Sequence, residues 1–116
     1  MRMNFSKNFK IVLSDDTKRE LKKLSKKYTS LPIDFLSLLD SLQQNPTQGT
    51  PLGKDSYKIR LKISSKNTGK SGGARVLTCV KIVKSKIFVF GIYDRSDVAV
   101  LTNKEIARRL KELDDL

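Results

Sequence analysis

An eight-residue alternation of apolar and polar side chains constrains the fold of this chain more than any other feature. Tyr57, Ile59, Leu61 and Ile63 alternate with Lys58, Arg60, Lys62 and Ser64. Because successive side chains of a β-strand point to opposite faces, the pattern predicts a strand with one face in the core. The other face then carries three cations. A register slip of one residue would bury those cations, so the orientation of this strand is strongly specified.

The flanking segments predict an α+β fold in the order β-α-α-β-β-β-α. Expected strands lie at 9–13, 57–64, 74–83 and 87–93, and expected helices run from Ser14–Thr17 through Tyr28, from Pro32 to Gln44 and from Thr102 through Leu113. The last strand is apolar on both faces and should be interior. The last three strands should form an antiparallel meander, with the helices packed on one face. Residues 45–56 hold two prolines and two glycines and are predicted to be a loop.

Two sequence pairs have the spacing of helix capping boxes. These are Thr17 with Glu20, ahead of the first helix, and Thr102 with Glu105, ahead of the last. In such a box the threonine accepts from the backbone N–H three residues later, and the glutamate returns to the cap. Both pairs therefore predict where a helix begins.

The length of 116 residues predicts a single domain spanning 1–116. With one cysteine, Cys79, no intrachain disulfide can form, and this cysteine is expected to be ordinary strand packing. The chain has no histidine, which excludes histidine acid–base catalysis and most zinc sites, and no cofactor is implied. No apolar run approaches the ~18 residues of a membrane span, and the first residues lack a signal peptide's apolar segment. We expect a soluble cytoplasmic protein.

The net charge of +12 is concentrated in one part of the chain. Residues 54–95 contain eleven bases and two acids, which accounts for nine of the twelve net charges. A local positive field of this kind is typical of a protein that binds a polyanion, most often nucleic acid. The alternative is a merely solubilising surface, although such surfaces usually mix both signs of charge.

Three clusters are candidates for chemistry. The first is the series of three cations on the alternating strand, whose side chains are spaced by ~6.6 Å. These cations repel one another unless an anion binds to them. The alternative is that they form only a solvated face of the sheet. The second, Gly69–Arg75, is a glycine-rich stretch that forms either a phosphate-binding nest or a flexible hairpin tip, and it lacks Walker A spacing. The third, Tyr93–Asp97, places a tyrosine and an arginine where a strand ends, suited to stacking on a base or holding a phosphate.

On these residues the chain resembles the RelE/ParE toxin superfamily, specifically the RelE/HigB-like ribosome-dependent mRNA interferases of type II toxin–antitoxin systems. The resemblance covers most of the chain and depends on the element order and three motifs. The motifs are YKIRLK at 57–62, K-S-G-G-A-R at 70–75 and IYDR at 92–95. The middle motif is the most specific.

The resemblance implies an endoribonuclease that cuts mRNA in the ribosomal A site and so inhibits translation. The residues it implies around the scissile phosphate are Lys58, Arg60, Lys62, Arg75 and Arg95, with Tyr93 as a substitute for a tyrosine that some relatives carry near the final helix. Further RNA-binding residues are expected at Lys54, Lys66, Lys70 and Lys81. Either Lys58 or Lys62 is the expected general base, because neighbouring cations favour a neutral lysine.

Arginine stays protonated in proteins, so the arginines are expected to stabilise the transition state. The implied partners are an acidic cognate antitoxin, the ribosome and mRNA, with no membrane and no metal. Two alternatives stay open: a non-cleaving relative that inhibits DNA gyrase, and a simple RNA-binding module.

Overall fold

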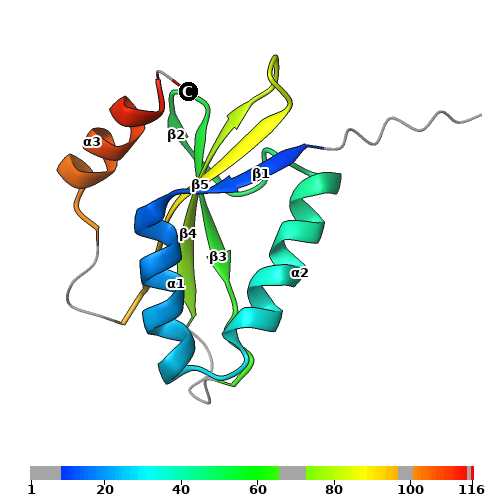
Figure 1. The fold of residues 1–116 in the computed structure, drawn as a ribbon, viewed down its shortest axis with the longest axis vertical. Helices are drawn as coiled ribbons and strands as arrows, with labels where there is room; N and C mark the ends of the chain where they lie inside the picture. Colours follow the sequence, from blue (N-terminus) through cyan, green and yellow to red (C-terminus); the bar gives the residue numbers. More distant parts are fainter. Residues whose placement is uncertain (1–8, 66–72, 97–100, 115) are drawn as a thin grey trace, which may run out of the picture.

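The computed structural model describes residues 9–65, 73–96, 101–114 and 116, and it confirms the α+β class and the predicted element order, with one additional strand, β2, after the second helix. The elements are β1 (Lys10–Leu13), α1 (Asp15–Lys27), α2 (Leu31–Gln44), β2 (Thr50–Gly53), β3 (Ser56–Leu61), β4 (Ala74–Lys81), β5 (Lys86–Asp94) and α3 (Asn103–Leu113). One five-stranded sheet has the order β1-β5-β4-β3-β2 (Figure 1). β1 runs parallel to β5 and every other pair is antiparallel. β5 is interior, as its apolar sequence predicted.

The prediction of a loop over 45–56 is wrong for residues 50–53, which form the edge strand β2 on β3. Pro51 lies in this strand, and an edge strand tolerates proline because its outer side needs no N–H donor. Gly49, at φ +105°, lets the chain cross β3 closely, since a Cβ there would lie 2.6 Å from the Lys58 carbonyl oxygen. Here the prolines and glycines, which usually indicate a loop, belong to a short edge strand and the turn before it.

The helices cover both faces of the sheet, so the expectation of one covered face is wrong for α3. α1 and α2 pack on one face, where Phe35 and Leu42 meet the apolar side of β3, including Ile59. α3 packs on the other face through Leu110 and Leu113. The side chains that it contacts there come from β4 and β5 and are Leu77, Cys79, Phe88 and Phe90. Cys79 is thus buried packing, as predicted.

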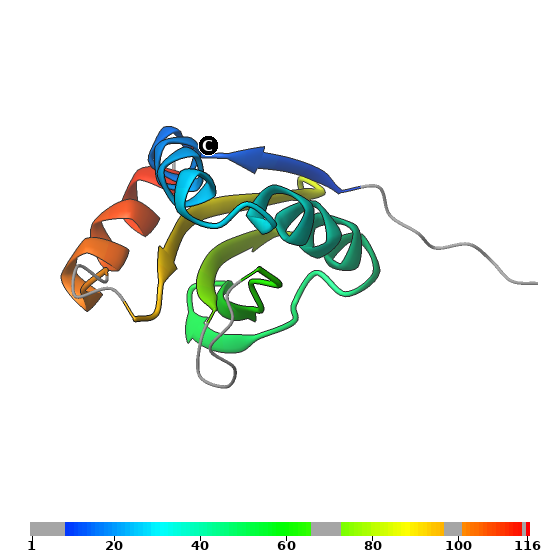
Figure 2. The ribbon, with the colours of Figure 1, turned by 90° about the horizontal axis from the view of Figure 1, so that it is seen from below.

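The reason for two covered faces is that β4 and β5 are apolar on both sides and both sides need burial. The residues packed against α3 come from these strands and from β1, and none comes from β3. Figure 2 shows α3 displaced to one side of the sheet, away from α2. The second face of β3 is therefore left uncovered by any described helix.

The two predicted capping boxes have different outcomes. α3 begins as predicted, with the Thr102 side chain accepting from the Glu105 N–H at 3.1 Å. α1 begins earlier than its box implies, because Ser14 is the N-cap and accepts from the Thr17 N–H at 3.1 Å. Thr17 and Glu20 bind β5 instead. The Thr17 hydroxyl donates to the Val89 carbonyl (2.9 Å), and the Glu20 carboxylate accepts from the Ile92 N–H (3.1 Å).

No helix among the described residues combines the length and the apolar character that a membrane span requires.

Candidate functional site

Three side chains of the candidate site form one row across the sheet. Arg60 of β3 is in register with Arg75 of β4, and Arg75 is in register with Tyr93 of β5. Directly opposed residues have Cβ atoms about 4.5–5.5 Å apart and share a face. Two cations placed opposite each other repel and weaken the sheet. The row therefore places positive charge together at a cost to stability.

A cleft of about 390 Å³ lies over Arg60 and Arg75 of this row, and we call it the cation cleft. Its lining residues are Gly49, Thr50, Leu52, Lys58, Arg60 and Arg75. Its charged residues are three bases and no acid. The predicted orientation of the alternating strand is confirmed: Ile59 and Leu61 are buried, while Arg60 is exposed and Lys58 half-buried.

Arg75 is the most unusual residue of the cation cleft, because it is a buried cation, 8% exposed, without an acidic partner. Its guanidinium Nη1 donates to the Ala74 carbonyl at 3.3 Å, and no described carboxylate forms an ion pair with it. Burial, followed by the positive charges of Arg60 and Arg95, lowers the pKa of Arg75. An arginine nevertheless stays protonated at neutral pH. Arg75 thus holds a charge and several N–H donors that no described carboxylate satisfies.

Arg95 is positioned by the turn that ends β5. Its backbone N–H donates to the Gly73 carbonyl at 3.1 Å, which places it beside the start of β4. The positive charge of Arg95 adds to burial and to the charge of Arg60 in lowering the pKa of Arg75. Gly73 has φ +104°, and a Cβ there would lie 2.6 Å from the Leu61 carbonyl oxygen, so the turn requires glycine.

The buried carboxylate of Asp94 fixes the same turn, a role that the sequence did not reveal. Asp94 is 1% exposed and accepts hydrogen bonds from the Tyr28 hydroxyl (2.6 Å) and from the Ser96 N–H (3.0 Å) and hydroxyl (2.9 Å). Lys27 adds a charge at 3.9 Å. The available signal was an acidic residue at the end of an apolar strand, but its partner Tyr28, which caps the C-terminal end of α1, is 66 residues away in the sequence.

Lys62 is exposed as predicted, but it does not line the cation cleft. It follows the end of β3 and acts on Asp34 in the first turn of α2. Partial burial raises the pKa of Asp34, but hydrogen bonds from Ser64 and Ser30, together with the Lys62 charge, lower it overall. Of the two candidate general bases, the structure therefore brings only Lys58 into the cleft.

The four further lysines of the prediction lie in different places. Lys54 is exposed at the turn between β2 and β3. Lys81 lies at the far end of β4, ~20 Å from Arg75 at 3.3 Å per residue, in a separate hollow with Asp55 and Asp114. Lys66 and Lys70 are outside the described residues, as is most of the predicted phosphate nest. Of the two lysines that the structure describes, neither lines the cation cleft.

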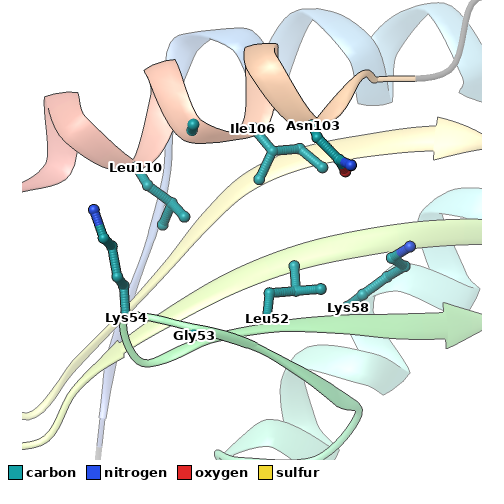
Figure 3. Close-up of a pocket in the computed structure, with 8 residues that line it drawn as sticks. Leu52, Gly53, Lys54, Lys58, Asn103, Ile106 and Leu110 are labelled. Carbon is teal, nitrogen blue, oxygen red and sulfur yellow. The ribbon is translucent and has the colours of Figure 1, made fainter.

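A second hollow, which we call the α3 pocket, adjoins the cation cleft and was not predicted from the sequence (Figure 3). It has a volume of about 550 Å³ and lies between α3 and the β2–β3 hairpin. Its lining residues are Leu52, Gly53, Lys54, Lys58, Asn103, Ile106, Ala107 and Leu110. Leu52 and Lys58 line both hollows, so the two adjoin at these side chains. No signal for this pocket was available, because it depends on the unexpected strand β2.

The described residues contain no group of three or more acidic or cysteine side chains that could hold a metal ion.

Two solved structures share this arrangement of strands and helices. A chain of the intact E. coli RelBE toxin–antitoxin complex matches with a TM-score of 0.50 and 20% identity, covering 77% of this chain and 99% of that one. The chain has the RelE-like fold. A chain of the archaeal RelE–RelB complex from Pyrococcus horikoshii OT3 matches with a TM-score of 0.51 and 16% identity, covering 78% and 98%. No protein-family model and no curated protein sequence matches the chain.

Proposed function

We propose that this RelE-like chain is the toxin of a type II toxin–antitoxin system, a ribosome-dependent endoribonuclease that cuts mRNA in the A site. The observation that carries the proposal is Arg75: a buried guanidinium, surrounded by cations, that no described carboxylate neutralises. A site of this kind is satisfied by an anion that brings several acceptor oxygens, as a phosphodiester does.

In the proposed reaction the scissile phosphate binds over the row of Arg60 and Arg75. The 2′-oxygen attacks phosphorus while Lys58, in its neutral form, accepts the 2′-hydroxyl proton. The bond from phosphorus to the 5′-oxygen breaks, leaving a 2′,3′-cyclic phosphate. Tyr93, which is in register with Arg75, gives a proton to the leaving 5′-oxygen in this proposal. The arginines stabilise the charge that develops on the phosphorane oxygens.

The cation cleft is lined by residues of β2 and β3, by Gly49 and by Arg75 of β4, and in this proposal these residues alone do not bend an RNA strand into line for attack. The ribosome would supply that geometry by holding the message in a fixed conformation, and such positioning contributes much of the rate of a catalysed reaction. Because the ribosome positions the RNA, the proposed cleavage activity depends on the ribosome.

An acidic antitoxin fits the same chemistry. The two solved counterparts come from toxin–antitoxin and RelE–RelB complexes, and the present chain has a net charge of +12. Carboxylates of such a partner, placed at Arg60 and Arg75, would neutralise the row and block access of RNA.

A reconstituted translation system tests the proposal. We expect the wild-type chain to cleave mRNA within the A-site codon and to cut naked RNA far more slowly. Arg75→Ala should lower the rate about 10²–10³-fold, the usual cost of removing one transition-state donor. Lys22→Ala is the matched control, because Lys22 is an exposed cation on α1, on the opposite side of the sheet. It should cleave like the wild type.

Three results would contradict the proposal. Intact mRNA in that system would exclude the cleavage activity, and RNA binding without cleavage would support the binding-module alternative. Inhibition of gyrase supercoiling at similar protein concentrations would support the gyrase alternative.

A further inference from the structure

We infer that the end of the sheet opposite the cation cleft is a docking surface for a protein segment that carries carboxylates beside aliphatic side chains. We call it the hairpin surface, and it consists of Lys10, Lys86 and Lys81 with the neighbouring Ile82 and Val83. None of these residues lines the cation cleft, so the inference does not depend on the proposed function. Lys81 and the arginine of the cleft lie about 20 Å apart on β4, so a bound segment leaves the cleft open.

Three lysines of the hairpin surface lie side by side across the sheet. Lys86 of β5 is in register with Lys10 of β1 on one side and with Lys81 of β4 on the other. Residues two positions apart on a strand share a face of the sheet. The residues two positions from these lysines all belong to the cluster that packs against α3: Val12, Phe88 and Cys79. The three lysines therefore project from that same face, just beyond the cluster.

The chain does not neutralise this row of lysines. Neighbouring strands are about 4.8 Å apart, and like charges placed directly opposite each other destabilise a sheet. None of the three lysines forms an ion pair with a carboxylate among the described residues. Lys10 is exposed, and Lys81 and Lys86 are half-buried. Carboxylates from outside the chain can therefore reach the row and relieve its repulsion.

The turn that joins β4 to β5 adds exposed apolar surface beside the row. Val83 is 99% exposed and Ile82 is 59% exposed, on a turn that projects at the top of Figure 1. Turns are usually formed by glycine, proline, asparagine, aspartate and serine. Two backbone hydrogen bonds hold this one in shape, from the Lys84 N–H to the Lys81 carbonyl (3.1 Å) and from the Ser85 N–H to the Ile82 carbonyl (3.0 Å). The apolar surface is thus formed before any partner binds.

A hollow beside the turn favours a protein segment over RNA or a lipid surface. It has a volume of about 350 Å³ and is lined by Asp55, Val80, Lys81, Ile82, Val83, Lys84, Asp114 and Leu116. None of these side chains is aromatic, so nucleobases would gain no stacking. The two aspartates repel the phosphates of RNA and of lipids, and a flat bilayer does not enter a hollow. An aliphatic side chain of a protein fills the hollow while its neighbouring carboxylates bind the lysines.

An NMR titration with defined peptides tests the hairpin surface. The probe is a capped five-residue peptide in which glutamate alternates with leucine. One control peptide has glutamine in place of each glutamate, and the other has serine in place of each leucine. We expect the probe to shift the methyl resonances of Ile82 and Val83 in a saturable manner at low salt. Each control peptide should bind at least about tenfold more weakly, because it lacks either the charge or the apolar contact.

Two variants separate the contributions of the apolar turn and the lysine row. Val83→Ser removes a fully exposed side chain and should weaken binding of the probe about tenfold without changing the fold. Lys86→Glu should weaken it by at least as much. It should also raise the Tm by about 4 °C, because it ends the repulsion with its two neighbours. The matched controls are Ile33→Ser and Lys18→Glu, exposed on α2 and α1, and both should bind like the wild type.

Arg75→Ala distinguishes the hairpin surface from the cation cleft, which also attracts acidic peptides. We expect this variant to keep the probe-dependent shifts of Ile82 and Val83. Loss of those shifts would mean that the probe acts from the cleft, and it would overturn the inference whether or not the chain cleaves mRNA. A chain that does not cleave mRNA but keeps the shifts would contradict the proposed function alone.

Four other results would overturn the docking surface. The first is unchanged binding of the probe by both Val83→Ser and Lys86→Glu. The second is a lower Tm of Lys86→Glu, which would show that the lysine is already satisfied within the chain. The third and fourth are tighter binding at Ile82 and Val83 by a 2′-O-methyl RNA nonamer or by phosphatidylserine vesicles, which would assign the surface to RNA or to a membrane.

Discussion

Arg75 and Arg109 are equally buried, at 8% and 7% exposure, yet their surroundings differ completely. Arg109 donates to the carboxylates of Glu20 (2.8 Å) and Glu105 (2.9 Å) and to the Phe90 carbonyl. Arg75 donates to the carbonyl of its own neighbour, and the charges around it are positive. One guanidinium is neutralised within the chain, and the other is not.

The pKa values of the two arginines change in opposite directions for this reason. Burial alone lowers the pKa of Arg109, but the hydrogen bonds to Glu20 and Glu105 outweigh burial and raise it. For Arg75, burial and like charges both lower the pKa. A buried charge that is paired with carboxylates of the same chain has a structural role. A buried charge without such a partner indicates a ligand site.

The largest effect is expected for Arg109→Ala, which should lower the free energy of unfolding by about 3–5 kcal/mol. The change leaves Glu20 and the Phe90 carbonyl without their partner and releases α3 from α1 and β5. Urea denaturation measures it. Arg108→Ala is the matched control, because Arg108 is exposed on the same helix and its solvent-screened pairs with Glu105 and Glu112 should contribute little to stability. Equal losses in both variants would remove the distinction between the two arginines.

A smaller effect of opposite sign is expected for Arg75→Met. Because this change relieves repulsion with Arg60 and Arg95 and keeps an apolar stem, the free energy of unfolding should stay constant or rise by about 1 kcal/mol. Added sulfate should raise the Tm of the wild type more than that of the variant, since an anion that binds the native state stabilises it. A clear loss of stability in Arg75→Met would show that Arg75 is a structural residue.

The smallest effect concerns pH. Hydrogen bonds from Arg108 and Arg109 lower the pKa of Glu105 from 4.5 to about 2. Stability from this carboxylate is therefore present above pH 4.5 and is lost as the pH falls through about 2. Chemical denaturation at pH 5 and pH 2.5 should show a steeper loss for the wild type than for Glu105→Gln. Arg75→Met should follow the wild type, because Arg75 has no described carboxylate to protonate.

Local patterns in the sequence predicted the parts of the fold that depend on near neighbours. The alternation around Arg60 gave the orientation of β3, and Thr102 gave the start of α3. The opposition of Arg60 and Arg75 needed the register between two strands, which the sequence does not state. The sequence therefore predicted these two arginines as candidate site residues, but not that they lie opposite each other.

The features that the sequence did not predict depend either on contacts between distant residues or on local backbone conformation. Arg109 joins Glu20 across 89 residues, so its role was invisible although its helical neighbour Glu105 lies four residues away. β2 was hidden by Pro51 and the glycines around it, and with β2 the α3 pocket was hidden too. α3 lies on the second face because β4 and β5 are apolar on that face too. Which residues of that face α3 covers is determined by the packing of the folded sheet.

β1 ends at Leu13, so on this side β5 continues beyond it with a row of backbone groups that no described strand pairs. Side chains close this edge: Thr17 binds the Val89 carbonyl, Arg109 the Phe90 carbonyl and Glu20 the Ile92 N–H. An apolar strand with an open edge is a template for addition of strands from other molecules, and so for aggregation. By filling the hydrogen-bonding positions with side chains from α1 and α3, the fold keeps its most apolar strand from recruiting a second chain.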